Sequence, residues 1–387
     1  MSVIINNMKI GHIYYRFPMF SGTSSYYKEF LDGILSVDDS ISIILLASKY
    51  PPKANIKTNK RFQIIWIKWL NIPILNNLFF EIAVFISGLC NKSFKEIDLI
   101  HVSNTRGVIA AKLLSLIYKK PLIITLEMLN DPTLGMINKL VYILQKLIFK
   151  YIKSNTIVCW SNYYYNILSN QWHIENNKIQ IIPPGINTKM FNPYISGDKI
   201  HSKYANGKLL IVFAKPLYPG NYSSALLLLQ SICISKYKEK IMILYGNGEY
   251  KNKLEIEIEK RNMKNQTNFM PKLVPLEQIP EYLSASDFIV LSFAYPPTIA
   301  RSFLEALAVG KPIIVTNLGE IPFVVTHGKN AMLSSTDPKD IAKNIDILIA
   351  NPNLQLKLSK NAYNLINTKF SEKNTSKIIV DLYKELL

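Results

Sequence analysis

Short apolar runs recur along the whole chain, and amphipathic segments with helical spacing separate most of them. Short apolar runs predict buried strands, and apolar residues at every third or fourth position predict helices that cover a sheet. The predicted helices of the N-terminal half span 24–35, 106–118 and 139–152. The predicted strands are 10–14, 41–47, 63–66, 99–102, 122–126, 156–159 and 179–182, then 208–215, 242–245, 268–270, 288–291, 312–315 and 331–333. This alternation predicts an α/β fold with parallel sheets.

A break near the middle of the chain predicts a domain boundary. The apolar strand that ends at Ile182 runs into Pro183, Pro184 and Gly185, and prolines and glycines of this kind interrupt regular structure. A chain of 387 residues is long enough for two domains with separate cores. We therefore expect two Rossmann-like domains that face a cleft, residues 1–187 and 188–370.

The segment 296–312, PPTIARSFLEALAVGKP, carries a single carboxylate, Glu305. It follows the predicted strand in 288–293, has helical spacing from Ala300 to Val309, and is ended by Gly310 before the next strand. The loop and the first helical turn therefore lie at the carboxyl edge of a parallel sheet. Open α/β folds bind ligands at that edge, and helix N-termini attract phosphate.

This segment resembles the donor-binding signature of the retaining nucleotide-sugar glycosyltransferases of family 4, also called glycosyl transferases group 1, which have the GT-B fold. Residues 305–312, EALAVGKP, reproduce the second half of the signature, and Arg301 matches a common variant. The resemblance implies that Glu305 binds the donor ribose and that Thr298 and Ile299 also contact the donor. The signature's first glutamate, which helps to hold the donor sugar, is replaced by Pro297.

The resemblance extends over nearly the whole chain. Residues 181–187, IIPPGIN, resemble the hinge between the two domains, and 371–387 would supply the last helix, which crosses back to the first domain in GT-B proteins. Gly246-Asn247-Gly248 stands where the family has Gly-Asp-Gly, so Gly246 is a candidate donor contact; the alternative is a tight turn that needs positive φ. Phe323 replaces a further family glutamate.

Basic residues should neutralise the diphosphate that leaves as the glycosidic bond breaks. Lys215 stands where the family has arginine after the first strand of the second domain, while Gly220 or Asn221 occupies the second basic position. Lysine offers a point charge in place of a planar fork, so Arg301 is a candidate supplement. The alternative for Arg301 is an ion pair with Glu305, four residues on along the same helix.

In the first domain the candidate residues follow the predicted strands. Ser21, Gly22 and Thr23 precede a helix and resemble the family loop that lies over the donor pyrophosphate and near the acceptor; a plain helix N-cap is the alternative. His101 resembles a strand-end histidine on the acceptor side, with a buried structural histidine as its alternative. Glu127 is a candidate acceptor base or acceptor ligand, with a hydrogen bond to a neighbouring loop as its alternative.

The chain is strongly basic, with a net charge of +18. The lysines are spread along the chain with no basic stripe interleaved with aromatics, which argues against nucleic acid as the partner. Lys139, Lys146, Lys150 and Lys153 fall on one helical face and predict peripheral contact with anionic lipid headgroups; the alternative is an amphipathic helix that packs on the sheet with solvated lysines. Residues 57–89, rich in aromatics, offer a second interfacial or acceptor surface, with a buried core helix as the alternative.

Three scattered cysteines, no signal-type N-terminus and no apolar run long enough to cross a bilayer predict a cytoplasmic protein. Carboxylates and histidines lack metal-ligand spacing, so we expect no cofactor and no required metal, with the nucleotide diphosphate sugar as substrate. The predicted activity is transfer of a sugar, with retention of configuration, to a hydroxyl of a lipid-linked or cell-surface glycan. The alternative is a catalytically degenerate GT-B protein that serves as a partner subunit or a nucleotide-sugar-binding module.

Overall fold

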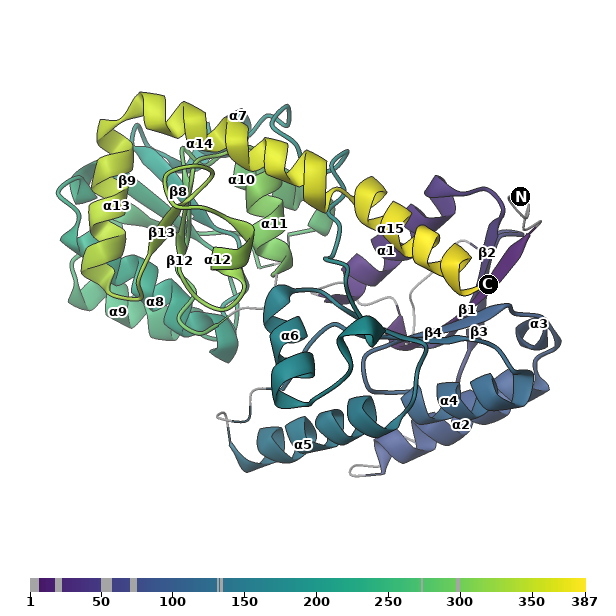
Figure 1. Ribbon diagram of the computed structural model, residues 1–387. Coiled ribbons are helices and arrows are strands. Elements are labelled where there is room, and N and C mark those ends of the chain that lie inside the picture. Colours follow the sequence, from purple (N-terminus) through teal and green to yellow (C-terminus); the bar gives the residue numbers. More distant parts are fainter. Residues whose placement is uncertain are drawn as a thin grey trace. The chain divides into compact units, whose positions relative to one another are not determined.

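A computed structural model describes residues 7–17, 23–49, 58–69, 75–130, 132, 135–272, 274–296 and 300–387. The chain divides into two compact units, Met1–Gly185 with Glu372–Leu387, and Ile186–Ser371 (Figure 1). Each unit is an α/β structure in which every assigned strand pairing is parallel. The predicted α/β class with parallel sheets is confirmed.

The first unit is built on one seven-stranded sheet in the order β3-β2-β1-β4-β5-β6-β7. Its central strands are apolar and buried on both faces, as the sequence runs predict; every residue of β4 and β5 is buried. The strand order reverses between β1 and β4, which is where doubly wound sheets place ligands. The strands are β1 Met8–Phe17, β2 Ile41–Lys49, β3 Phe62–Trp66, β4 Leu99–Ser103, β5 Leu122–Leu126, β6 Thr156–Cys159 and β7 Ile179–Ile181.

Helices cover both faces of this sheet. One core lies between the sheet and α2, α4 and α5, where Phe80, Leu114 and Phe149 point inward. A second core lies on the opposite face, under α1 and α15, around Tyr27 and Tyr383. The helices of this unit are α1 Thr23–Val37, α2 Asn76–Cys90, α3 Lys92–Lys95, α4 Val108–Tyr118, α5 Met136–Tyr151, α6 Asn162–Asn166 and α15 Glu372–Leu386, with single turns at Ile167–Gln171 and Asn176–Lys178.

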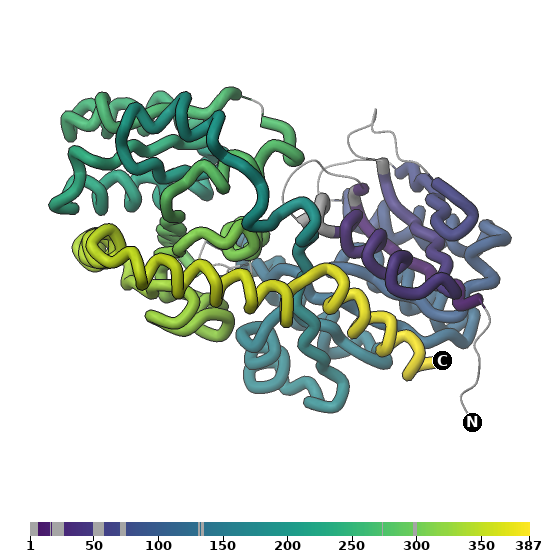
Figure 2. Tube along the Cα trace, turned by 90° about the horizontal axis from the view of Figure 1, so that it is seen from above, coloured from purple at the N-terminus to yellow at the C-terminus, as the bar shows by residue number. Residues whose placement is uncertain are grey.

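The C-terminal helix α15 belongs to the first unit although the second unit precedes it in the chain. It runs beside α1 in Figures 1 and 2. The two chain crossings between the units pass close together, since a Cβ on Gly185 would collide with the Thr375 hydroxyl and the Glu372 backbone. The lack of a side chain at Gly185 therefore allows the two crossing segments to pack closely against each other.

The second unit contains two three-stranded parallel sheets, β10-β9-β8 and β11-β12-β13. They adjoin at β8 and β11, where the Asp287 N–H donates to the Leu210 carbonyl at 2.9 Å and the Leu210 N–H donates to Asp287 Oδ2 at 2.7 Å. Strand order therefore reverses between β8 and β11. The strands are β8 Leu209–Phe213, β9 Ile241–Tyr245, β10 Thr267–Phe269, β11 Ile289–Leu291, β12 Ile313–Thr316 and β13 Met332–Ser334.

Helices alternate with these strands as the sequence predicts, and the longest, α8, buries an apolar run that includes Leu227, Leu228 and Leu229 against the sheets. The helices are α7 Asp198–Tyr204, α8 Pro219–Ile234, α9 Lys251–Lys260, α10 Ile279–Ser284, α11 Arg301–Ala308, α12 Ile321–Val324, α13 Pro338–Ala350 and α14 Pro352–Leu365, with single turns at Lys238–Lys240, Lys264–Gln266, Leu276–Gln278 and Ile366–Phe370.

A buried polar network ties α15 to the first sheet. Tyr383 Oη lies 2.6 Å from His101 Nδ1 and 3.2 Å from His12 Nε2. His101 Nε2 lies 2.6 Å from Thr125 Oγ1, and His12 Nδ1 lies 2.8 Å from Tyr27 Oη. Burial lowers the pKa of His12 well below its ordinary value and that of His101 to about 3, so both imidazoles are neutral at pH 7.

Replacing Tyr383 with phenylalanine should destabilise the first unit. The change removes one hydroxyl and leaves buried imidazole nitrogens without their partner, which costs about 1–3 kcal/mol of unfolding free energy. Thermal or urea unfolding measures the loss. The matched control is Tyr363→Phe on α14, which lies outside this network and should cost less than about 0.5 kcal/mol. Equal stability of Tyr383→Phe and wild type would contradict the role given to the network.

Candidate functional site

At the carboxyl edge of the second unit's sheets lie several residues that the sequence singled out, together with Phe293. Lys215 follows β8, Gly246 follows β9, and Phe293 and Arg301 follow β11. Strand order reverses between β8 and β11, so this edge holds the topological switch point of the unit. Lys215 and Phe293 come from the two strands on either side of that point.

The Lys215 ammonium lies over the Phe293 ring, 3.8 Å from its centroid. Burial of the ammonium lowers its pKa from the ordinary value to about 7, while the nearby Glu305 carboxylate acts in the opposite direction. The ring face attracts the cation but cannot replace the hydration that it has lost. A desolvated cation at a switch point is therefore suited to bind an anionic group.

Glu305 lies in α11 with a side chain only 9% exposed, and Arg301 Nε donates to its Oε1 at 2.6 Å. The two residues are four apart on one helix, so their side chains meet on the same face. Arg301 thus forms the ion pair that was its alternative, and the pair is largely buried, with Arg301 14% exposed and 6.0 Å from the Phe191 ring centroid. The pair fixes the direction of the Glu305 carboxylate.

Gly246 and Gly248 are required by close packing. Neither has a positive φ, so the expected tight turn with positive φ is wrong. A Cβ on Gly246 would collide with the Lys215 carbonyl, and one on Gly248 would lie 2.7 Å from the Leu217 carbonyl oxygen. The Gly246 N–H donates to the Phe213 carbonyl at 2.9 Å. Gly246 therefore supports the backbone that carries Lys215, and its own N–H is already used.

Several predicted residues lie outside the described part of the chain. These are Ser21 and Gly22, between β1 and α1 in the sequence, and Pro297, Thr298 and Ile299, between β11 and α11. Thr23 is the first residue of α1, although its side chain is not described.

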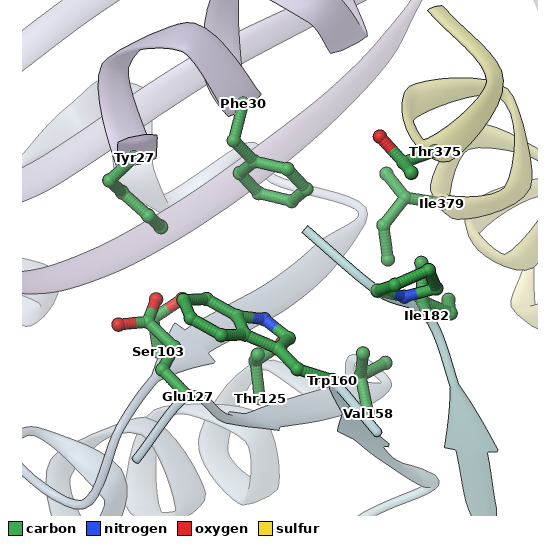
Figure 3. A pocket seen from close by; sticks show the side chains of 11 residues that line it. Tyr27, Phe30, Ser103, Thr125, Glu127, Val158, Trp160, Ile182, Thr375 and Ile379 are labelled. Atoms are coloured by element: carbon green, nitrogen blue, oxygen red, sulfur yellow. The ribbon is translucent and has the colours of Figure 1, made fainter. Parts of the chain in front are cut away.

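A narrow pocket lies at the carboxyl edge of the first unit's sheet (Figure 3). Thr125, Glu127 and Trp160 line it from the sheet edge, Tyr27 and Phe30 from α1, and Thr375 and Ile379 from α15. Figure 3 shows the Glu127 carboxylate beside the Trp160 ring, with Phe30 facing them. The cavity volume is about 10 Å³, which is space for about one water molecule.

Glu127 follows β5 and is 1% exposed. Asn104 Nδ2 donates to Glu127 Oε2 at 2.6 Å, and Asn104 holds a left-handed backbone conformation, with φ of 67°. Burial raises the pKa of Glu127 to about 8, against the opposing effect of hydrogen bonds from Asn104 and Ser103. Glu127 is therefore mostly protonated at pH 7, so it acts as a hydrogen-bond donor and not as a ready base.

His101 is fully buried, and both ring nitrogens are hydrogen-bonded within the first unit. This geometry favours the structural alternative over contact with an acceptor. Among the described residues no group of three or more His, Cys, Asp or Glu side chains could hold a metal ion.

Two partners of the candidate residues were not predicted. Phe293 ends an apolar run, so its sequence context predicts a core residue. Its contact with the Lys215 ammonium is seen only in the packing of the two strand ends. Asn104 follows β4 as Glu127 follows β5. Asparagine directly after a buried strand is a signal that could have been used, because asparagine tolerates the left-handed region and neighbouring parallel strands end at one edge.

Comparison with known proteins covers both halves of the chain. Residues 38–190 match the family model described as Glycosyltransferase Family 4, and residues 198–365 match that described as Glycosyl transferases group 1. An uncharacterized glycosyltransferase of Methanocaldococcus jannaschii is 26% identical over 335 residues, which is 86% of this chain and 80% of that protein.

A relative with a named activity is the N,N'-diacetylbacillosaminyl-diphospho-undecaprenol alpha-1,3-N-acetylgalactosaminyltransferase of Campylobacter jejuni. It is 25% identical over 304 residues, 76% of this chain and 77% of the relative. The crystal structure of Anabaena HepE in complex with UDP is similar with a TM-score of 0.76 at 16% identity, covering 98% of this chain and all of that one. The two family models and the shared fold agree: the chain belongs to glycosyltransferase family 4, of the group 1 type, and has the GT-B fold.

Proposed function

We propose that this protein transfers a sugar from a nucleoside diphosphate sugar to a hydroxyl group of a lipid-linked or cell-surface glycan, with retention of configuration. The observation that carries the proposal is the desolvated Lys215 ammonium beside Glu305 at the switch point of the second unit. The UDP bound to HepE supports the donor class, and the diphospho-undecaprenol in the name of the Campylobacter relative supports the acceptor class.

In this proposal Lys215 stabilises the diphosphate leaving group. Negative charge grows on the bridging oxygen and the phosphates as the glycosidic bond breaks, and a cation already stripped of water stabilises that charge strongly. The acceptor hydroxyl then attacks from the face that the diphosphate leaves, and its proton passes to the departing phosphate oxygen as the new glycosidic bond forms. Since Lys215 supplies positive charge at the diphosphate, the proposal includes no resident metal ion.

Glu305 binds the ribose hydroxyls in this proposal. A carboxylate accepts two hydroxyl hydrogen bonds well when its direction is fixed. The Arg301 Nε contact at 2.6 Å holds one oxygen of this carboxylate.

On the acceptor side, Glu127 contributes a hydrogen bond from its protonated carboxyl. The pocket has space for about one water molecule, so it can admit a single acceptor hydroxyl group. The proposal places the enzyme in the cytoplasm, at the inner face of the cell membrane, because a lipid-linked acceptor is anchored there.

Replacing Lys215 with arginine should remove the pH dependence of nucleotide binding. Wild-type affinity for UDP should fall between pH 7 and pH 8.5, by up to about tenfold per pH unit, because the free Lys215 ammonium loses its proton near pH 7. Arginine stays charged throughout, so calorimetric titration of Lys215→Arg should give a flat profile. A wild-type profile that is already flat, or a variant with an unchanged slope, would rule out Lys215 as the diphosphate cation.

Replacing Glu305 with glutamine should weaken UDP binding by about 10- to 100-fold, because the carboxylate that accepts from the ribose hydroxyls is lost. Glu259→Gln on α9, an exposed carboxylate of the same unit, is the matched control and should bind normally. UDP-sugar hydrolysis should follow the same order and persist in EDTA. Tight UDP binding without turnover on any donor would instead favour the degenerate binding module.

Replacing Glu127 with glutamine should change how stability depends on pH. The folded pKa of about 8 lies above the unfolded value of about 4.3, so wild-type stability is lost as pH rises between these values. Relative to wild type, Glu127→Gln should gain roughly 3 °C in melting temperature per pH unit over this range. Glu175→Gln, at an exposed site, is the control. Parallel melting profiles of Glu127→Gln and wild type would show that Glu127 is ionised in the fold.

A further inference from the structure

The helix α5 directs its apolar side to solvent. Its buried positions include Gln145 and Phe149, on the side toward the sheet. Large apolar side chains recur on the opposite side at helical spacing and are 44–80% exposed. The alternative, an amphipathic helix that packs on the sheet with solvated lysines, therefore holds only in part: Phe149 lies in the core with Tyr142 and Ile148 packed against it, but most large apolar side chains of the helix face solvent. The exposed positions include Met136, Leu140, Ile143, Leu144, Leu147 and Tyr151.

The neighbouring helices of the same layer also expose large apolar side chains, in addition to the apolar residues that they bury on their inner sides. Helices α2 and α4 pack on each other, with the Tyr118 hydroxyl donating to the Gly88 carbonyl at 2.9 Å. Figure 1 shows α2, α4 and α5 on one side of the first unit's sheet. More than half of the large apolar side chains exposed in the described part of the chain lie on these three helices or directly before α2. On α4 they are Ile109, Leu113, Leu116 and Ile117, and on α2 they are Leu78, Ile82 and Ile86.

An exposed apolar surface spread over three helices is unusual for a protein that meets only water, because large contiguous patches of this kind mark interaction sites. Within the described residues no helix is long and apolar enough to cross a membrane. A partner of this surface therefore binds to the outer sides of these three helices.

The charges on and beside these helices indicate which kind of partner binds the apolar surface. Lys139, Lys146, Lys150 and Lys153 lie along one edge of the apolar side of α5. The only carboxylate in the three helices is Glu81, which accepts from the main-chain N–H groups of Gly107 and Ala110 at 2.7 and 2.9 Å and so caps α4. A row of positive charge along one edge of an apolar surface complements anionic headgroups above acyl chains. A second copy of this chain would bring like charges together.

We propose that the outer face of α2, α4 and α5 docks on a lipid bilayer that contains anionic lipids, with the apolar side chains entering the boundary between headgroups and acyl chains. This extends the proposed function, which rests on a lipid-linked acceptor. The bilayer itself is the partner named here, and its binding needs neither donor nor acceptor.

Flotation of the full chain with unilamellar vesicles tests the proposal. The protein should float with vesicles of phosphatidylcholine that contain one-third phosphatidylglycerol, and only weakly with phosphatidylcholine alone. Leu140→Glu with Leu147→Glu should reduce flotation at least about tenfold, because two apolar anchors become charged. Ile109→Glu with Leu116→Glu repeats the test on α4. The control is Ile256→Glu with Leu356→Glu, at positions 54% and 71% exposed on α9 and α14.

The charge component has its own matched pair. Lys139→Glu with Lys150→Glu should reduce flotation roughly tenfold, whereas Lys357→Glu with Lys360→Glu on α14 should not, although the net charge changes equally. Absence of flotation for wild type, or equal loss in the face and control variants, would overturn the proposal. A wild-type dimer that the face variants convert to monomer would assign the face to a second copy. UDP binding, measured in parallel, should be unchanged in every variant, so failure of nucleotide binding alone would count against the proposed function only.

Discussion

Parallel strands that are buried on both faces carry mainly apolar side chains. The polar and charged groups that can contact a ligand therefore lie at the carboxyl edge of each unit's sheet. In the second unit this constraint brings the end of β8 against the end of β11, and the Lys215 ammonium against the Phe293 ring. The ammonium loses water there, and its pKa falls to about 7. Gly246 leaves room for the backbone that carries Lys215, since any side chain at position 246 would collide with the Lys215 carbonyl. The packing of the fold thus creates the electrostatic property on which the proposed donor binding depends.

The first unit uses the same constraint differently. Its buried polar groups are held neutral, with His12 and His101 hydrogen-bonded to tyrosines and Glu127 protonated beside Asn104. Neutral groups at a sheet edge orient hydroxyls but do not attract a diphosphate. The two units therefore differ in chemistry, one carrying a desolvated cation and the other a set of neutral donors and acceptors, and this difference fits the proposed transfer from an anionic donor to a neutral hydroxyl.

Much of the fold was predictable because its strands are continuous apolar runs. The predicted strands 122–126 and 156–159 coincide with β5 and β6, and the others agree within a few residues. The Arg301–Glu305 ion pair was also predictable, because it depends only on helical spacing. The sequence did not predict contacts between distant segments. These are the Lys215 ammonium over the Phe293 ring and the hydrogen bond from Asn104 to Glu127.

The apolar surface of α5 shows a different limit of sequence interpretation. Its periodicity correctly predicts a helix with one apolar side, but periodicity does not say which side faces the protein. The usual arrangement, with the apolar side inward, holds here only for Phe149 and the partly buried Tyr142 and Ile148, while most large apolar side chains of the helix face solvent. The signal that could have helped was the absence of acidic residues from α2, α4 and α5 apart from Glu81. A solvated helix layer usually carries both signs of charge.

The most direct test of the account is a crystal structure of the full chain with UDP bound. The account predicts a β-phosphate oxygen within hydrogen-bond distance of Lys215 Nζ and the ribose hydroxyls on the Glu305 carboxylate. Nucleotide bound elsewhere on the chain, or bound with Lys215 still resting on Phe293 and no phosphate beside it, would contradict it.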